Sequence, residues 1–273
     1  MGATDPLYPF LKWPGGKRWL TSHSDLFPPD YKTYYEPFLG GGSVFFSLNP
    51  DNAVLSDINC SLISCYKILR NNWRELHQKL AEMQELHSVD YFYKIRKDTK
   101  GTSLNRAARF LYLNRTCFNG LYRENRLGEF NVPVGTKTTV LLSTDNFAES
   151  SRRLRRAELV ACDFEVTLKK VQKEDFVFID RPYTVAHNQN GFIKYNDSMF
   201  SWQDQQRLMR CVEDLRDKGA YVLISNANHE SIRDLYRGIG KMRSVSRPSL
   251  LAGKKSARKA TSELMICINY NQS

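Results

Sequence analysis

Several patterns that would assign this chain to a common functional class are missing from it. The six cysteines form no C-x-x-C pair, which argues against a zinc knuckle and a thioredoxin-type redox site. No apolar run approaches the ~18 residues of a membrane-spanning helix. The N-terminus MGATDPLYPF lacks the basic segment and long apolar core of a signal peptide. We therefore expect a reduced, cytoplasmic protein without a metal site or a membrane span.

Two motifs of nucleotide and base chemistry are missing as well. Gly40-Gly41-Gly42 does not continue into a G-x-G-x-x-G fingerprint. The third glycine of that fingerprint packs a helix whose N-terminus faces a pyrophosphate. Its absence favours a nucleoside cofactor without pyrophosphate, of which S-adenosylmethionine is one. No Pro-Cys dipeptide occurs, which disfavours cytosine C5 methylation through a cysteine nucleophile.

The charge balance is the most unusual bulk property that is present. Among 273 residues, 40 are Lys or Arg and 29 are Asp or Glu, giving a formal net charge of +11. A hydrophobic content of 41% is ordinary for a globular protein, so a core can form without disulfide bonds or a structural metal. A polyanion is the expected partner, and nucleic acid is the commonest one. The alternative is a basic surface that serves solubility only.

Strand and helix patterns alternate at both ends of the chain. Strand candidates lie at 34–38, 53–57, 158–162, 176–179, 220–225 and 263–268. Apolar residues at helical spacing lie between them, namely Leu62, Tyr66, Leu69, Leu208, Val212 and Leu215. Ser201 and Asp204 have the spacing of a capping box. The alternation predicts an α/β fold with a mostly parallel sheet covered by helices on both faces.

The middle of the chain follows a different pattern. Residues 72–150 hold helical segments and polar loops but few strand candidates. A helix is predicted at 105–116, and 118–136 has the Asn-Gly, Leu-Gly and Val-Pro-Val-Gly composition of a loop and hairpin. We therefore predict a catalytic core formed by 1–71 and 151–273, with 72–150 inserted into it as a separate domain.

The glycine turn is paired with an acid. Glycines that follow a strand let the backbone approach a ligand closely. Asp57 ends the next strand candidate, at about the spacing expected of an acid that binds ribose hydroxyls. Together they favour a nucleoside cofactor over an ordinary tight loop.

The stretch FVFIDRPY (176–183) joins an apolar strand to an acid, a proline turn and an aromatic ring. Methylation of an exocyclic base amine needs acceptors for its N–H groups, so that the nitrogen lone pair is localised. The Asp180 carboxylate and the carbonyl of residue 181 would serve, while Pro182 fixes the turn and Tyr183 stacks on the base. The alternative is a strand-end acid beside an ordinary proline turn.

These segments resemble a known family, the Dam-type (D12 class) DNA adenine-N6 methyltransferases. The matching stretches, in family order, are FLKWPGGK (10–17), YYEPFLGGGSVFF (34–46), LSDIN (55–59), LYLNRTCFNGLYRENRLGEFNVPVG (111–135) and FVFIDRPY (176–183). The resemblance implies a Rossmann-like core with a mostly parallel seven-stranded sheet, S-adenosyl-L-methionine as cofactor, and double-stranded DNA as substrate. It implies that 72–150 is the target-recognition domain and that the target adenine is flipped out of the duplex.

The resemblance also implies roles for individual residues. The catalytic residues are Asp180, Pro182 and Tyr183. The cofactor-binding residues are Trp13, Lys17, Gly40, Gly42, Asp57 and Asp180. The DNA-binding residues are Lys12, Phe118, Asn119, Leu121 and Arg123. Arg123 is expected to contact guanine in a GATC site, with a phosphate contact as the alternative.

One residue departs from the family. Members carry D-P-P-Y where this chain has Arg181 in place of the first proline. The carbonyl, the acid and the ring survive, but a rigid φ near −65° is lost. Either the site works with Arg181 turned away, or methyl transfer is crippled; we expect reduced turnover. The alternatives to an active DNA methyltransferase are a DNA-binding protein that keeps the cofactor pocket and an RNA adenine methyltransferase.

Three further expectations complete the sequence-based predictions. The four arginines between 152 and 156 are expected on the solvated face of a helix, with a part in DNA binding as the alternative. The basic stretch 254–259 is expected in a loop close to DNA phosphates. A monomer is the default. The biological setting remains open between a restriction-modification partner, a phage-borne enzyme and a housekeeping mark.

Overall fold

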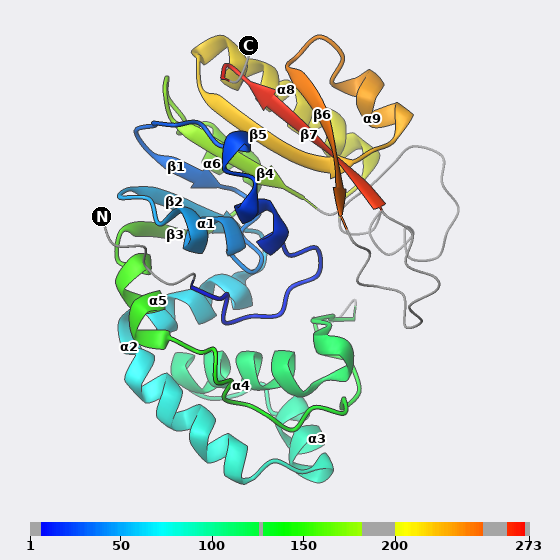
Figure 1. Ribbon diagram of the computed structural model, residues 1–273. Coiled ribbons are helices and arrows are strands. Elements are labelled where there is room, and N and C mark those ends of the chain that lie inside the picture. Colours follow the sequence, from blue (N-terminus) through cyan, green and yellow to red (C-terminus); the bar gives the residue numbers. More distant parts are fainter. Residues whose placement is uncertain (1–6, 126–127, 182–199, 248–260, 271–273) are drawn as a thin grey trace. The chain divides into compact units, whose positions relative to one another are not determined.

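A computed structural model of the protein describes residues 7–125, 128–181, 200–247 and 261–270 (Figure 1). The chain forms two compact units. The first comprises Met1–Thr21, Leu39–Asp51 and Ser56–Cys162, and the second comprises Ser22–Phe38, Asn52–Leu55 and Asp163–Ser273.

Seven strands form one sheet in the order β3-β2-β1-β4-β5-β7-β6. Their bounds are Tyr34–Glu36 (β1), Ala53–Asp57 (β2), Ala157–Ala161 (β3), Phe176–Asp180 (β4), Tyr221–Ala227 (β5), Lys241–Arg247 (β6) and Thr261–Ile268 (β7). Strand β1 pairs in parallel with β2 and β4, and β4 pairs in parallel with β5, whereas β7 is antiparallel to β5 and β6. The predicted α/β fold with a mostly parallel, Rossmann-like seven-stranded sheet is confirmed.

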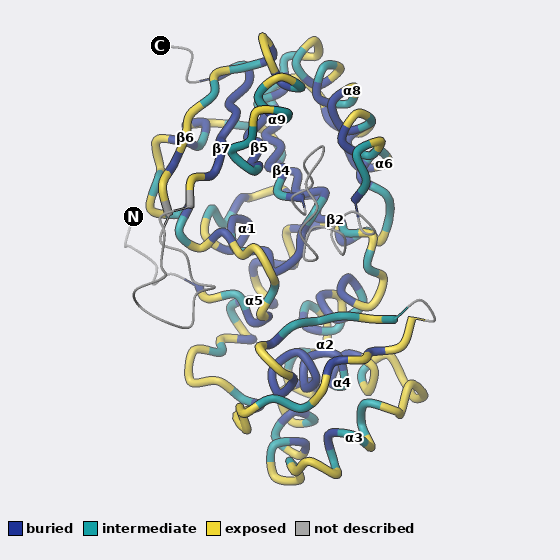
Figure 2. The backbone as a smooth tube through the Cα atoms, turned by 90° about the vertical axis from the view of Figure 1, so that its right-hand side faces the viewer, coloured by how far each residue is buried: buried dark blue, intermediate teal, exposed yellow. Residues whose placement is uncertain are grey.

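The second unit buries one face of its strands under helices. Helix α8 (Trp202–Lys218), α6 (Phe164–Leu168) and α9 (Glu230–Leu235) contribute apolar residues to a single cluster with alternate residues of β4, β5 and β7. Figure 2 shows the same strands and the inner side of α8 as buried. Ser201 and Asp204 form the predicted capping box, and Leu208, Val212 and Leu215 are buried as expected.

The opposite face of these strands is aromatic. Phe176 lies 5.6 Å from Tyr34 and 6.2 Å from Phe27, measured between ring centroids. Tyr31 contacts both Tyr34 and Phe176. The short 3₁₀ helix η2 (Ser24–Leu26) lies beside this cluster, since the Tyr270 hydroxyl donates to the Leu26 carbonyl at 2.9 Å.

The first unit is mainly helical. Its helices are α1 (Ser43–Leu48), α2 (Cys60–Glu85), α3 (Val89–Lys97), α4 (Ser103–Thr116) and α5 (Phe147–Leu154), with 3₁₀ helices η1 (Arg18–Ser22) and η3 (Phe118–Gly120). Helices α2 and α4 pack on each other, with the Cys65 thiol of α2 3.9 Å from the Ala107 carbonyl of α4. The predicted stripe of α2, formed by Leu62, Tyr66 and Leu69, is buried. Helix α2 has a kink at Asn72, whose φ of −135° and ψ of 42° are not helical.

A buried ion pair joins the end of α4 to the polar segment that follows. The Arg115 guanidinium donates to both carboxylate oxygens of Asp145, at 2.6 and 2.7 Å, and its side chain is only 2% exposed. It also donates to the carbonyls of Val140 and Phe10, at 2.6 and 2.7 Å. One side chain thus holds two chain segments that have no regular structure of their own, one at Phe10 and one from Val140 to Asp145.

Two expectations about single elements were incomplete or wrong. Strand β6 was not predicted, because KMRSVSR is an edge strand with one face in solvent and little apolar content. The expectation of a solvated arginine cluster is wrong for Arg153, which is 3% exposed. Its guanidinium donates to Glu149 at 2.7 Å and to the Phe46 carbonyl. The basic stretch 254–259 lies outside the described residues.

Candidate functional site

The predicted glycine turn and the predicted ribose acid are in direct contact. The Gly40 N–H donates to Asp57 Oδ2 at 3.1 Å, and the Asn59 N–H donates to Oδ1 at 3.0 Å. Burial raises the pKa of the Asp57 carboxyl, and these backbone donors act in the opposite direction. Because β1 and β2 are parallel, the segments after both strands meet at one edge of the sheet. The acid is therefore fixed by the same turn it was predicted to accompany.

Two positions of the turn, Gly40 and Gly42, cannot accommodate another residue without strain. Gly40 and Gly42 have φ of 47° and 64°, in the left-handed region that favours glycine. A Cβ on Gly42 would lie 3.0 Å from the Tyr66 hydroxyl, which itself donates to the Gly40 carbonyl at 3.0 Å. Tyr66 was predicted only as a core residue; its role in fixing the turn had no signal in the sequence.

Trp13 closes one side of the turn. A Cβ on Gly40 would lie 2.6 Å from Trp13 Cδ1, so the indole is in direct contact with the glycine backbone. Lys17 is 3% exposed and donates to the Gly15 carbonyl at 2.8 Å. The structure thus brings Trp13, Gly40 and Asp57 together. The backbone cradle without Cβ atoms and the strand-end carboxylate fit a nucleoside with free hydroxyls.

Lys12, next to Trp13, packs on the loop that follows α4. Its aliphatic stem lies against Gly120, where a Cβ would be 2.4 Å from Lys12 Cδ. The Asn114 side chain fixes its main chain, accepting from the Lys12 N–H at 3.0 Å and donating to its carbonyl at 2.7 Å. The sequence offered one signal for Asn114, a polar residue within the otherwise apolar run LYLN. Burial, and then the neighbouring Lys137, lower the pKa of Lys12.

The loop after α4 presents an exposed aromatic ring. Phe118 is 53% exposed, and Asn119 has a φ of 55°. A backbone hydrogen bond stabilises the loop, since the Phe118 N–H donates to the Pro133 carbonyl at 2.9 Å. Leu121 is half-buried, and the Arg123 guanidinium donates to Asn131 at 2.8 Å. The predicted DNA-binding residues therefore lie on one well-supported loop, together with Lys12.

Asp180 ends β4 and is paired in register with Ser225 of β5. Val177 and Ile179, which alternate along β4 with Phe178 and Asp180, belong to the apolar cluster under α6 and α8. The Asp180 carboxyl therefore lies on the opposite face of the sheet from that cluster.

Arg181 is directed to the other face. It is 2% exposed, and its guanidinium donates to Asn226 Oδ1 at 2.5 Å and lies 5.3 Å from the centre of the Phe200 ring. Burial raises the pKa of the Tyr236 hydroxyl to about 12, and the nearby charge of Arg181 acts in the opposite direction. Phe200 and Tyr236 belong to the apolar cluster on the α8 and α9 side. Pro182 and Tyr183 lie outside the described residues.

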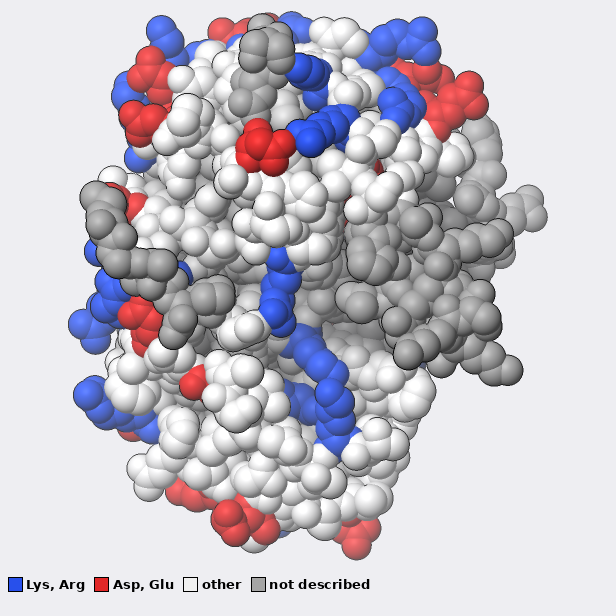
Figure 3. Space-filling model, viewed as in Figure 1, with Lys and Arg blue, Asp and Glu red and all other residues white. Residues whose placement is uncertain are grey.

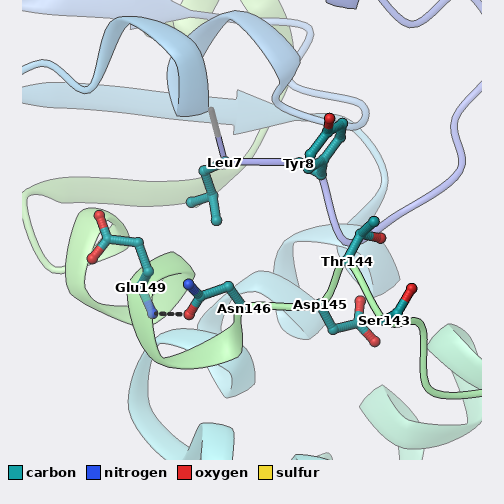
Figure 4. Close-up of a pocket in the computed structure, with 7 residues that line it drawn as sticks. All are labelled: Leu7, Tyr8, Ser143, Thr144, Asp145, Asn146 and Glu149. Carbon is teal, nitrogen blue, oxygen red and sulfur yellow. Dashed lines mark hydrogen bonds between the residues drawn. The ribbon is translucent and has the colours of Figure 1, made fainter. Parts of the chain in front are cut away.

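A shallow pocket of about 410 Å³ lies elsewhere, between the start of the chain and α5 (Figure 4). It contains none of the predicted site residues. Asp145 and Glu149 line it, and both carboxylates are engaged by arginines. An acidic pocket of this kind does not suit an anionic ligand, and we assign no function to it.

The described residues contain no group of three or more His, Cys, Asp or Glu side chains that could hold a metal ion. All six cysteines are free thiols. None of the helices in the described part of the chain has the length and apolarity needed to cross a bilayer.

The chain matches known proteins over most of its length. Residues 13–248 match the model of a family described as D12 class N6 adenine-specific DNA methyltransferase. The chain is 35% identical to the Type II methyltransferase M1.LlaDCHI of Lactococcus lactis subsp. cremoris, over 97% of this chain and 96% of that protein. It is 33% identical to the Type II methyltransferase M.MjaIII of Methanocaldococcus jannaschii, over 96% and 99%. It is 32% identical to a DNA adenine methylase of Haemophilus influenzae, over 84% and 83%.

Proposed function

Since the chain belongs to the D12 class of N6 adenine-specific DNA methyltransferases, we propose that it transfers a methyl group from S-adenosylmethionine to adenine N6 in double-stranded DNA. The observation that carries the proposal is the hydrogen bond from Gly40 to Asp57, with Trp13 against the turn. Trp13, Lys17, Gly40, Gly42 and Asp57 would hold the cofactor. Asp57 would bind the ribose hydroxyls through the acceptor capacity that its two backbone donors leave.

Asp180 would receive the target amine. S-adenosylmethionine, when bound, supplies an electrophilic methyl group on a sulfonium. The Asp180 carboxylate and the carbonyl of Arg181 would each accept one N–H of the amine, which aims the nitrogen lone pair at that methyl group. Pro182 would fix the turn and Tyr183 would stack on the base. These roles need no covalent intermediate with the protein.

The target adenine must leave the duplex to reach Asp180, so base flipping belongs to the proposal. Residues 72–150 would form the target-recognition domain, and the kink of α2 at Asn72 coincides with its predicted start. Phe118 or Leu121 would fill the space left in the base stack. Lys12, Asn119 and Arg123 would contact the bases of a GATC site, with Arg123 on guanine.

The position of Arg181 favours an active site over a crippled one. Its guanidinium binds Asn226 on the face of the sheet opposite to the Asp180 carboxyl. A cation held there neither crowds the base nor repels the sulfonium directly. We therefore propose that methyl transfer survives, against the reduced turnover expected from sequence.

The test is transfer of labelled methyl from S-adenosylmethionine to a short GATC duplex. The wild-type chain, Arg181→Pro and Asp180→Asn are compared, with a duplex carrying a scrambled site and a single-stranded RNA beside them. We expect the wild type and Arg181→Pro to label the GATC duplex alone. Asp180→Asn should lower the rate of methyl transfer at least 10³-fold, because it removes transition-state contacts worth about 4 kcal/mol. Label only from Arg181→Pro would support the impaired DNA-binding alternative. Label on RNA alone would overturn the DNA substrate.

A further inference from the structure

An aromatic stack joins the loop after α4 to the wall of the glycine turn. The Trp13 and Tyr122 rings lie 5.8 Å apart with an interplanar angle of 21°. Phe110 of α4 completes the group, 6.3 Å from Trp13 and 4.4 Å from Tyr122. Since Trp13 also contacts the Gly40 backbone, one continuous packing path runs from Gly40 through Trp13 to Tyr122.

Tyr122 is held on several sides. Its hydroxyl donates to Glu124 at 2.5 Å, and its ring lies 5.3 Å from Phe130. The Ser61 side chain, in the first turn of α2, lies near this phenol and opposes the rise in its pKa that burial causes. Ser61 lies a few residues beyond Asp57, so Tyr122 is near the segment that follows β2, and Trp13 connects it to the segment that follows β1. It directly precedes Arg123 in the chain.

Lys12 provides a second connection of the same kind. Its stem packs on Gly120 of the loop, while the next residue, Trp13, packs on Gly40 of the turn. The gaps that these contacts leave are too small for a Cβ atom at either glycine. Close-packed groups without free space transmit displacements instead of absorbing them. A ligand that orders the glycine turn therefore constrains Trp13, and through it the position of Tyr122.

We propose that Tyr122 is a positioning residue that couples occupancy of the cofactor pocket to the conformation of the target-recognition loop. The inference rests on the proposed function, because it assumes that Gly40 faces the cofactor and Arg123 faces DNA. It deepens that function by predicting a positive linkage: cofactor raises affinity for the target duplex, and the target duplex raises affinity for cofactor by the same factor. A coupling factor of about 10 lies within the range typical of such linkage.

The test is a binding cycle with S-adenosylhomocysteine, which occupies the pocket but cannot transfer methyl. The dissociation constant of a GATC duplex is measured with and without saturating S-adenosylhomocysteine, and that of S-adenosylhomocysteine by calorimetry. We expect a ratio of about 10 in the wild type, a ratio near 1 in Tyr122→Ala and Tyr122→Leu, and an unchanged ratio in Tyr122→Phe, which keeps the ring. Tyr122→Leu keeps most of the side-chain volume, so the binding ratio can still be measured without the aromatic ring if the alanine variant unfolds.

A matched control is Tyr93→Leu, a tyrosine of α3 that packs on Phe92 and Arg96 outside the stack. It should retain the wild-type ratio. A wild-type ratio carried over unchanged into Tyr122→Leu would overturn the role of Tyr122. A ratio of 1 in the wild type, with both ligands bound, would overturn the coupling and leave the proposed function standing. Failure of S-adenosylhomocysteine to bind the wild type would instead contradict the proposed function.

Discussion

Gly40 is the residue on which the candidate cofactor site depends most directly. It combines a left-handed φ of 47° with a contact to Trp13 that leaves no room for a side chain. Gly40→Ala should therefore lower S-adenosylmethionine affinity at least ~10-fold, since the strained backbone alone costs about 1–2 kcal/mol and the indole must also move. Isothermal titration of the purified variant measures the change.

Gly238 offers the control for this prediction. Its φ is 77° and an added Cβ would meet nothing within 4 Å. Gly238→Ala thus introduces the same backbone strain without a collision and should leave cofactor affinity unchanged. Equal affinities in wild type and Gly40→Ala would contradict the assignment of the turn to the cofactor.

Arg181 can be tested as a packing residue independently of catalysis. Arg181→Ala removes a buried side chain that contacts Asn226 and the Phe200 ring, and should lower the free energy of unfolding by about 2 kcal/mol. Arg181→Met keeps much of the volume without the charge, and should cost less than half as much, because a buried charge is itself expensive to desolvate. Urea unfolding measures both. If Arg181→Met lost as much unfolding free energy as Arg181→Ala, the charge, and not the packing, would be what stabilises this position.

The residue contacts also show where prediction from sequence stops. Gly40 and Asp57 were paired in advance because the acid ends the next strand candidate at about the spacing of a ribose-binding acid. The side to which Arg181 turns was left open, because it depends on which face of the sheet carries α8. The Trp13–Tyr122 stack had no signal at all, since it joins side chains far apart in the chain through the packing of α4. The functional roles of these residues stay predictions.

At the scale of elements, α5 carries a charge arrangement with a predictable pH dependence. Glu149 lies in its first turn and accepts from Arg152 at 2.6 Å and Arg153 at 2.7 Å. The Arg152 hydrogen bonds, followed by those of Arg153, lower the pKa of Glu149 from 4.5 to about 2. A lowered acid pKa stabilises the fold above the unfolded value of 4.5, and that stability is lost as the pH falls toward 2.

Glu149→Gln should therefore lower the free energy of unfolding at pH 7 by about 1–2 kcal/mol, after allowance for solvent screening of a carboxylate at the surface. The difference from wild type should shrink as the pH falls below 4.5. Urea unfolding across pH 3 to 7 measures it. Glu82→Gln, which removes an exposed pair with Lys79, should cost less than about 0.5 kcal/mol. A constant difference across the pH range would mean that packing, not ionisation, explains the effect.

Elements with a strong apolar period were predicted well, and so was the edge strand β3, whereas the edge strand β6 was not. The stripes of α2, α4 and α8 lie where spacing placed them, and strands β4, β5 and β7 match apolar runs. Strand β6 is specified by pairing with β7 instead of by its own composition. Arg153 was misplaced because a cluster of like charges usually points to solvent, whereas here the buried guanidinium donates to Glu149 and to the Phe46 carbonyl.

At the scale of the whole molecule, the formal net charge of +11 is unevenly distributed. Figure 3 shows a run of Lys and Arg side chains over the region of α4, whereas basic and acidic side chains are mixed along the other margins of that face. Lys12 and Lys137 are neighbours in the first unit, and burial first, then the adjacent Lys137 ammonium, lower the pKa of Lys12. Such a pair is relieved when both ammonium groups face an anion, which fits a DNA surface better than a basic surface kept for solubility.

Salt titration tests this distribution. Duplex binding should weaken steeply between 50 and 200 mM salt, because each phosphate contact adds about −0.9 to the slope of log K against log salt concentration. Lys137→Ala should reduce the magnitude of the slope by about one contact, and should weaken target and scrambled duplexes alike, since it removes a phosphate contact and no base contact. Lys79→Ala removes an equal charge on α2 that is already paired with Glu82 at 2.9 Å, so its slope should equal that of the wild type. Equal slopes in all three proteins would place the DNA surface elsewhere on the molecule. A loss confined to the target duplex in Lys137→Ala would instead assign that lysine to base recognition, beside Lys12.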